Sequence, residues 1–512
     1  MKSPPHTAWA LPNKTAFNDL RKSLTSNYGL QQRLGRVKRV DVLDDYDFSL
    51  WHANAGLIKI TQRDYLFTRD SDEIEVSALA APARFWWDFP AGEVQTSLKR
   101  LSPLRAFVPF AWVRFVVHHY DLTNADDKVV VRLKLIQHYA ADTPQSHKVI
   151  GIYIQAQALR GYESDFRRVG DIVNAAGVKP APLPTMRQLL INQGQQIRAK
   201  PDKRFGIKGE MAAEVAVRKM GLGMMTIAQS QRAGILADTD TEFLHQYRVH
   251  LRKLRSLIAL TKQCLTPELL VQLKGDLAEV FAPTSDLRDL DVFLLEQSSY
   301  QLLLPDEFRA GVEKLFQKIA RERQSAYRRL CGKLKTKHYQ TVLARISALL
   351  KQDPEFSAEA SRRSIHKLAA KRIGARYRKI RRIGHAITAN TPDNEVHALR
   401  IECKKLRYLL EFFTELFDKK TILKLTKQLK RLQDILGEFN DYSVQQQFLL
   451  QLAEKERAKT VLAAIHGLVA VLNQKQIRAR DRVTTACTVF ASGETTALVK
   501  SLLTSNPRKV LK

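Results

Sequence analysis

Basic side chains recur at helical spacing in one short segment of the chain, and their chemistry is that of anion binding. Intervals of three or four residues separate His245, Arg248, Arg252 and Arg255. With about 100° between successive residues of a helix, these four fall within a stripe roughly 80° wide, and Lys253 lies to one side of it. A guanidinium group can donate two parallel hydrogen bonds to two oxygens of one phosphate, and lysine adds a point charge. The segment therefore predicts a helix face that binds a phosphate-bearing anion.

A second segment repeats this pattern. A shift of 152 residues matches the first segment to a second that contains His397, Arg400, Lys404, Lys405 and Arg407. The same shift aligns Lys219 with Lys371, Asp289 with Asp441 and Val292 with Val444. One ungapped shift that holds over positions about 70 residues apart indicates an internal repeat. We therefore predict two similar helical halves, at about 210–350 and 362–505.

The apolar residues of both segments lie away from the cations, as on the core face of an amphipathic helix. They are Tyr247, Leu251, Leu254 and Ile258 in the first copy, and Leu399, Leu406 and Leu410 in the second. Four or five cations on one helix face repel one another, and an anion along the stripe would relieve that repulsion. A solvated basic surface is the alternative, but two copies in matching register favour a function. Replacing either stripe by alanine is expected to weaken binding comparably.

The whole chain is strongly basic. It has 512 residues, with 83 Lys and Arg against 52 Asp and Glu, and a formal net charge of +31. Residues 201–512 hold 56 of the basic residues and 33 of the acidic ones, so most of the excess lies in the C-terminal part. A charge of this size favours an anionic partner. The apolar content of 45% is enough for folded cores.

Composition argues against several other classes of protein. The cysteines are scattered without C-x-x-C spacing, which argues against a disulfide framework or a zinc site; they are Cys264, Cys331, Cys403 and Cys487. Residues 1–17 lack the apolar core of a signal peptide, and no run of 18 apolar residues predicts a membrane span. We therefore expect a cytoplasmic protein without a membrane partner.

The N-terminal part of the chain has the pattern of a β-rich domain, predicted at residues 1–179. Runs typical of strands occur at 57–60, 115–122, 128–139 and 148–155. In the third run Val131, Leu133 and Leu135 alternate with Arg132 and Lys134. This alternation predicts a strand with one buried and one basic face.

The C-terminal part has the pattern of an all-α domain. Three prolines in close succession begin a predicted linker at 180–208. Residues 209–508 then show apolar residues at spacings of three and four, as in LLVQLKGDLAEVF, which is typical of packed amphipathic helices. The fold class is therefore predicted to be α+β, with the two classes in separate domains.

The repeated motifs resemble the CHAD domain, the conserved histidine α-helical domain. The resemblance rests on H-x-x-R-[VI]-x-x-[RK]-K-L-R, present twice, with LRDLDV or LGEFNDYSV downstream, and covers roughly residues 210–505. It implies two four-helix bundles related by a pseudo-twofold axis, with inorganic polyphosphate as ligand. Carried onto this sequence, the binding residues are His245, Arg248, Arg252, Lys253, Arg255, His397, Arg400, Lys404, Lys405 and Arg407, with Lys219, Lys371, Arg372 and Arg376 from the opening helices. Asp289 and Asp441 would orient arginines or cap helices.

Residues 1–175 resemble a divergent CYTH domain, the triphosphate tunnel fold, which implies an antiparallel β-rich domain. The similar stretches are DDYDFSLWHANAGLIKI at 44–60 and ALRGYESDFRRV at 158–169. Active members of that family open with an E-x-E-x-K strand, and the corresponding HTAWALPN has no such pattern. Glu73 and Glu75 form an E-x-E pair, but Ser77 stands where lysine is needed, and we interpret the pair as a solvated acidic turn. We therefore expect no catalysis, no metal and no cofactor.

Two other functions remain open. A nucleic-acid-binding protein would be attracted by the same charge, although zinc-finger spacing and RNP-like aromatic strands are not found in the sequence, and the stripes offer few aromatics for base stacking. A triphosphatase or polyphosphatase acting through the N-terminal domain is the second alternative. The favoured prediction is a non-catalytic polyphosphate-binding protein associated with polyphosphate granules, which binds nucleic acid only weakly. The sequence does not predict an oligomeric state.

Overall fold

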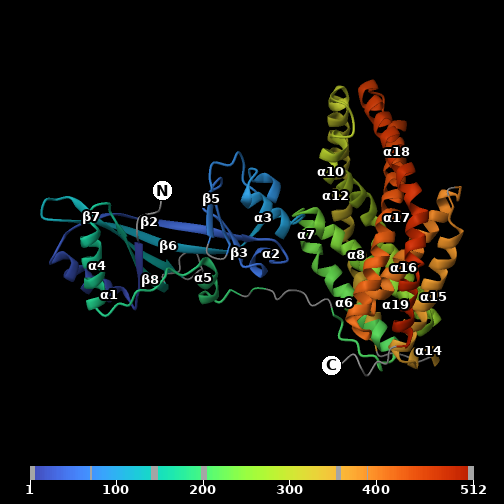
Figure 1. The fold of residues 1–512 in the computed structure, drawn as a ribbon, viewed down its shortest axis with the longest axis horizontal. Helices are drawn as coiled ribbons and strands as arrows, with labels where there is room; N and C mark the ends of the chain where they lie inside the picture. The colour runs from blue at the N-terminus through green and yellow to red at the C-terminus, as the bar shows by residue number, and fades with distance from the viewer. Residues whose placement is uncertain are drawn as a thin grey trace. The chain divides into compact units, whose positions relative to one another are not determined.

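The computed structural model describes residues 6–69, 72–139, 148–195, 197, 204–352, 359–388 and 390–504. The chain divides into two compact units, Met1–Pro201 and Asp202–Lys512. Figure 1 shows strands in the first unit and helices in the second. The predicted α+β class is therefore confirmed.

The first unit is built on one antiparallel sheet of eight strands, in the order β1-β8-β7-β6-β2-β3-β4-β5. The strands are β1 (His6–Leu11), β2 (Gly29–Asp44), β3 (Ala55–Lys59), β4 (Tyr65–Arg69), β5 (Asp72–Val76), β6 (Val108–Thr123), β7 (Val129–Tyr139) and β8 (Val149–Ala158). Val131, Leu133 and Leu135 of β7 are buried and Arg132 is exposed, which confirms the predicted alternation.

Short helices pack against this sheet over three apolar clusters. The helices α1 (Lys14–Thr25) and α4 (Glu163–Ala175) share one cluster with β1 and β8, and Trp9 Nε1 donates to Asn174 Oδ1 at 3.1 Å. A second cluster includes residues of α2 (Ser49–His52) and α3 (Glu93–Leu101). The sheet is thus stabilised by several small cores rather than one large one.

Two local predictions differ from the structure. The segment 180–208 was predicted as a linker, yet it contains α5 (Met186–Asn192), whose Leu189 and Leu190 are buried against the sheet. Residues 196 and 198–203 of that segment, like the predicted domain ends before 6 and beyond 504, lie outside the described residues. Glu73 and Glu75 do not form a turn: they are exposed on β5, which ends the sheet, because β5 pairs with β4 along their length.

The second unit is helical and consists of two halves. The first half contains α6 (Ala213–Ser230), α7 (Arg232–Leu236), α8 (Thr241–Leu260), α9 (Pro267–Phe281), α10 (Ser285–Leu295), α11 (Gln297–Gln301), α12 (Arg309–Lys335) and α13 (Lys337–Lys351). The second contains α14 (Glu359–Arg362), α15 (Ile365–Ala386), α16 (Asp393–Phe412), α17 (Lys419–Glu454), α18 (Lys459–Phe490) and α19 (Gly493–Thr504).

The 152-residue shift is visible in the helix boundaries. The helices α8 and α16 begin and end 152 residues apart, and so do the short 3-10 turns Lys262–Cys264 and Thr414–Leu416 that follow them. The next helices, α9 and α17, also begin 152 residues apart. The halves differ after this point, since Pro283 lies in the break between α9 and α10, where α17 continues through Ile435. Proline lacks the backbone N–H and interrupts a helix, whereas isoleucine does not.

The two halves meet at equivalent residues. Ala212 forms an isolated antiparallel bridge with Ser364, its counterpart under the shift. The Ala213 N–H donates to the Arg363 carbonyl, and the Ile365 N–H donates to the Met211 carbonyl, both at 2.9 Å. When each residue is replaced by its counterpart 152 residues away, each of these two hydrogen bonds becomes the other. The two halves are therefore related by a local twofold axis at this contact.

The core face of the repeated helices is as expected. Tyr247, Leu251, Leu254 and Ile258 of α8, and Leu399 and Leu406 of α16, have no exposed surface. The four cysteines are free and buried. Within the described ranges, none of the helices combines the length and apolar character that a bilayer crossing requires.

Candidate anion-binding site

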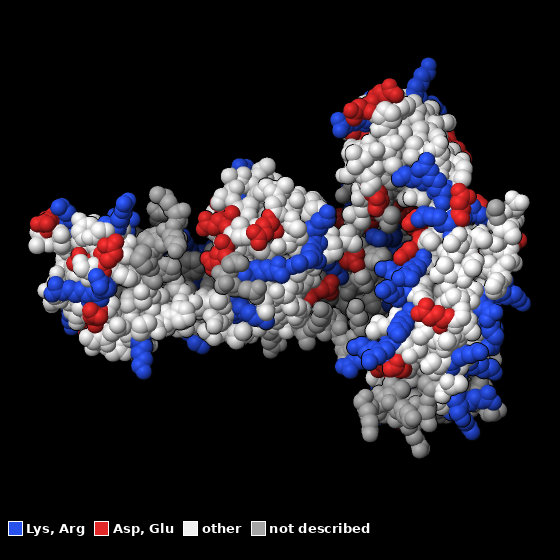
Figure 2. All heavy atoms as spheres, in the orientation of Figure 1, with Lys and Arg blue, Asp and Glu red and all other residues white. Residues whose placement is uncertain are grey.

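The helices α8 and α16 pack against each other and bring the two predicted stripes together. Asp240 caps the start of α8, because its carboxylate accepts the N–H groups of Glu242 and Phe243. Burial of the apolar face then fixes the rotation of each helix, leaving Arg252 and Arg255 of α8 and Arg407 of α16 exposed. Figure 2 shows Lys and Arg side chains gathered in a band over this part of the helical unit.

Arg252, Arg400 and Lys404 form the centre of the site, and they come from both halves. The pKa of Lys404 is lowered to about 8, mainly by burial and then by the charges of Arg400 and Arg252. Burial also lowers the pKa of Arg400; Asp441 opposes this shift and Arg252 adds to it. Arg400 Nη2 donates to Asp441 Oδ1 at 3.3 Å. These mutual effects require the three cations to lie within range of one another's charge.

Arg248 and Arg255 flank the aromatic ring of Phe281. Their guanidinium carbons lie 4.4 Å and 5.0 Å from the ring centroid. Arg248 Nη1 also donates to the hydroxyls of Thr284 at 2.5 Å and Ser285 at 3.1 Å. Burial lowers the pKa of Arg248 to about 10, against the raising effect of Asp289. Cation–π contacts and hydrogen bonds therefore hold these guanidiniums in place while they remain charged.

Several other predicted ligands form ion pairs with carboxylates of the protein. Glu411 forms an ion pair with Lys253 Nζ and accepts a hydrogen bond from Arg407 Nε, both at 2.8 Å. The buried Glu402 accepts from Lys405 Nζ at 2.9 Å and also forms an ion pair with Arg376. The structure therefore places these four cations in internal networks, which the spacing of the stripes did not predict.

The remaining candidates lie in different environments. Lys219 Nζ donates to the Gly206 carbonyl at 2.8 Å, and Arg372 donates to Gln263 of the other half. Lys371 is exposed on α15. His397 Nδ1 lies 2.8 Å from Asn440 Oδ1, so the amide oxygen accepts an Nδ1–H, and Nε2 remains to contact a ligand. His245 of α8 is partly buried.

Sequence reasoning missed Arg288, Phe281, Glu402 and Glu411. Arg288 of α10 lies within range of the charge of Arg252, which adds to the lowering of the Arg288 pKa by burial. It stands at the position of Asn440 under the shift. A comparison of the two copies would have singled out Arg288, because it is a cation of the first copy whose counterpart in the second copy is uncharged. The charge effect of Asp289 on Arg248 and the hydrogen bond from Arg400 to Asp441 fit the predicted orienting role of the two aspartates.

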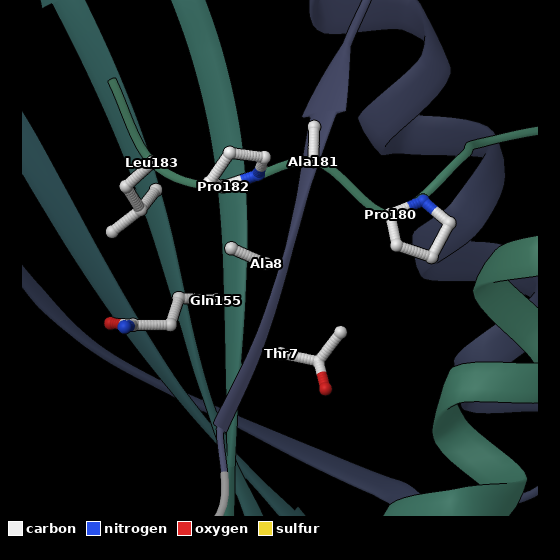
Figure 3. Close-up of a pocket in the computed structure, with 7 residues that line it drawn as sticks. All are labelled: Thr7, Ala8, Gln155, Pro180, Ala181, Pro182 and Leu183. Carbon is white, nitrogen blue, oxygen red and sulfur yellow. The ribbon is translucent and has the colours of Figure 1, made fainter. Parts of the chain in front are cut away.

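A hollow of the first unit shows no comparable collection of charge. This hollow, of about 420 Å³, lies beside β1 and is lined by Thr7, Ala8, Gln155, Pro180, Ala181, Pro182 and Leu183, a set without an ionisable side chain (Figure 3). Throughout the described ranges, no three or more His, Cys, Asp or Glu side chains are grouped so that they could hold a metal ion.

Comparisons with known proteins identify the helical unit. Among solved structures, the CHAD domain from the plant Ricinus communis is 21% identical, with a TM-score of 0.46, over 55% of this chain and 93% of that one. PptA from Streptomyces chartreusis is 15% identical (TM-score 0.37; 54% and 99% covered), and HpAC1 from Hippeastrum, reported to have a dominant triphosphatase activity, is 11% identical (TM-score 0.25; 38% and 96% covered). None of the curated proteins matches at a significant level. A family model described as the CHAD domain matches residues 226–450, and the chain therefore contains a CHAD domain.

Proposed function

We propose that the helical unit binds inorganic polyphosphate where α8 meets α16, without catalysis, and that the protein associates with polyphosphate granules. The observation that carries this proposal is the convergence of Arg252, Arg400 and Lys404 from two halves of the repeat. Like charges held this close, of which Arg400 and Lys404 are partly buried, destabilise the folded protein unless an anion neutralises them. A phosphate chain supplies several negative charges in a row and can contact all three.

A chain of phosphates fits this arrangement better than a single anion does. The cations lie on two helices, so a ligand that reaches both gains a second contact that is effectively intramolecular. Arg252 and Arg255 are exposed, so their guanidiniums can donate to a phosphate in a bidentate manner. Long polyphosphate should therefore bind far more tightly than pyrophosphate.

Nucleic acid would be attracted by the same cations, but the site offers it less. Binding of single strands relies on aromatic rings on which bases stack. The guanidiniums of Arg248 and Arg255 already lie over the ring of Phe281. This ring is therefore engaged by cations of the protein and is less open to a base.

The test is equilibrium binding of length-defined polyphosphates to the full chain over a series of salt concentrations. We expect affinity to rise with chain length and to fall steeply with salt, because counterions are released from each neutralised phosphate. Single-stranded RNA and DNA serve as competitors at the same salt. Affinity that is independent of polyphosphate length, or nucleic acid that displaces long polyphosphate at equal phosphate concentration, would overturn the proposal.

A further inference from the structure

The two stripes end differently. Beyond Arg407, the stripe of α16 continues one turn further to Glu411, whereas the equivalent position of α8 is Ala259. Since Glu411 follows His397 by 14 residues, it lies on the same helix face as the stripe. The repeat therefore places a carboxylate at the end of one stripe and a methyl group at the end of the other.

Glu411 binds one cation from each half. Its Oε2 lies 2.8 Å from Lys253 Nζ of α8, and its Oε1 lies 2.8 Å from Arg407 Nε of α16. The side chain of Glu411 is 28% exposed although its Oε2 atom is buried. The side chains of Lys253 and Arg407 are 29% and 52% exposed, so a ligand can reach the two cations. Burial opposes ionisation of Glu411, but Lys253 and Arg407 outweigh it and hold its pKa below the ordinary range.

We propose that Glu411 is an internal competitor of the bound polyanion, occupying two cations that the ligand can engage only by displacing it. This inference rests on the proposed polyphosphate binding at the same site. The two ends of the site then contribute unequally to binding. The main contacts to the ligand come from the cations that Glu411 does not occupy, which are Arg252, Arg255 and Arg288 of the first half with Arg400 and Lys404. The end of the site at Arg407 contributes only where the ligand carries enough charge to replace a carboxylate.

The counterparts of Lys253 and Arg407 in the other half have different partners. The counterpart of Lys253 is Lys405, which forms its ion pair with Glu402 of its own helix, three residues away. The counterpart of Arg407 is Arg255, which lies over Phe281. Neither Lys405 nor Arg255 can pair with a counterpart of Glu411, because the equivalent residue is the exposed Ala259. Ala259→Glu is therefore a matched variant that adds the missing competitor to the other stripe.

The experiment measures polyphosphate affinity and its salt dependence in the full chain for the wild type, Glu411→Gln and Ala259→Glu. Glu411→Gln should raise affinity about three- to tenfold, because two partly exposed charge pairs no longer oppose the ligand. It should steepen the salt dependence by about one to two in slope, as two more cations neutralise phosphates. Ala259→Glu should lower affinity by a similar factor. Arg407→Ala should weaken binding more in the Glu411→Gln background than in the wild type.

The outcomes separate this inference from the function on which it rests. Wild-type protein that does not bind polyphosphate overturns the proposed function, and this inference with it. Wild-type protein that binds, with a Glu411→Gln variant of equal or lower affinity and unchanged melting temperature, overturns the competitor role alone. Should Glu411→Gln lose stability, Ala259→Glu decides the question, because it leaves the Lys253–Glu411–Arg407 contacts intact; affinity equal to that of the wild type would then refute the inference.

Discussion

Arg252 and Lys404 are equivalent residues of the two halves, and they lie close enough for the charge of Arg252 to lower the pKa of Lys404. Equivalent residues can be neighbours only beside the axis that relates their halves. Ala212 and Ser364, another equivalent pair, are bridged directly. The internal symmetry thus brings like charges together, and the resulting repulsion is a property of the fold that an anion can relieve.

Binding should weaken as pH rises through the pKa of Lys404. Burial and the charges of Arg400 and Arg252 set this pKa at about 8 in the free protein. An anion prefers the protonated amine, so affinity should be highest below about pH 7 and fall by about pH 9, while an ordinary lysine stays charged to about 10.4. Lys404→Arg, which keeps its charge over this range, should bind with little pH dependence. The same decline in Lys404→Arg as in the wild type, measured by titration of affinity, would contradict this assignment.

The fragment 202–512 should fold by itself as an almost wholly helical protein. The chain divides between Pro201 and Asp202, and every described element after this point is helical apart from the single Ala212–Ser364 bridge. Circular dichroism should show helix without appreciable strand, with one cooperative thermal transition. A strand signal, or a fragment that is unfolded while the full chain is folded, would refute this.

The repeat and the core face were predictable because both depend on local periodicity. Helical spacing of Tyr247, Leu251 and Leu254 sets their burial, whichever partner covers them. The strands β3, β6, β7 and β8 were visible as apolar or alternating runs, but β2 was not. Its GLQQRLGRVKRVDVLD has few apolar residues in its first half, and Gln31, Gln32 and Arg33 are exposed in the sheet. Pairing with β6, rather than burial, holds that part of the strand.

The identity of the neutralised cations was harder to predict. The pairs Lys405–Glu402 and Arg407–Glu411 lie three and four residues apart on one helix, so spacing alone could have indicated them. The pair Lys253–Glu411 joins two helices of different halves, and the contact of Arg248 with Phe281 depends on the packing of α9. Such contacts follow from how the helices pack, which periodicity does not specify.

The protein should not hydrolyse ATP or tripolyphosphate in the presence of Mg²⁺ or Mn²⁺. The E-x-E-x-K strand expected at the start of an active CYTH domain is not found, and Glu73 and Glu75 lie exposed on β5 without a lysine at position 77. A phosphate-release assay checks this. Metal-dependent turnover that is lost on Glu73→Gln with Glu75→Gln would show that these carboxylates hold a catalytic metal.

Glu402→Gln should destabilise the helical unit. Its carboxylate is only 6% exposed and forms ion pairs with Arg376, Lys379 and Lys405. Removing the charge leaves three cations beside one another, and with allowance for the partial exposure of the lysines we expect a loss of about 2–3 kcal/mol in the free energy of unfolding. Urea denaturation measures it, with the exposed Glu395→Gln on the same helix as control. Equal midpoints for the two variants would contradict a stabilising role for Glu402.

The two stripes should contribute unequally to polyphosphate binding, in contrast to the equal contributions that their spacing predicts. Arg252 and Arg255 form no ion pair with a described carboxylate, whereas Arg400 is hydrogen-bonded to Asp441 and Arg407 to Glu411. A hydrogen bond to a charged group contributes about 1.5–3 kcal/mol only where it is newly made to the ligand. Replacing Arg248, Arg252 and Arg255 by alanine should therefore weaken binding about a hundredfold or more. The matching change at Arg400, Lys404 and Arg407 should weaken binding about tenfold.

Stability must be measured beside affinity in these variants, because not every residue of the stripes is free of structural contacts. Arg248 donates to Thr284 and Ser285 and lies over Phe281, so its loss should lower the melting temperature. The double variant Arg252→Ala with Arg255→Ala keeps the hydrogen bonds of Arg248 and should keep most of the affinity loss. Its melting temperature should change little, because loss of the Arg255 contact with Phe281 is offset by relief of the repulsion around Arg252. If this double variant binds long polyphosphate as the wild type does while remaining folded, the exposed stripe of α8 is ordinary basic surface and the anion site lies elsewhere.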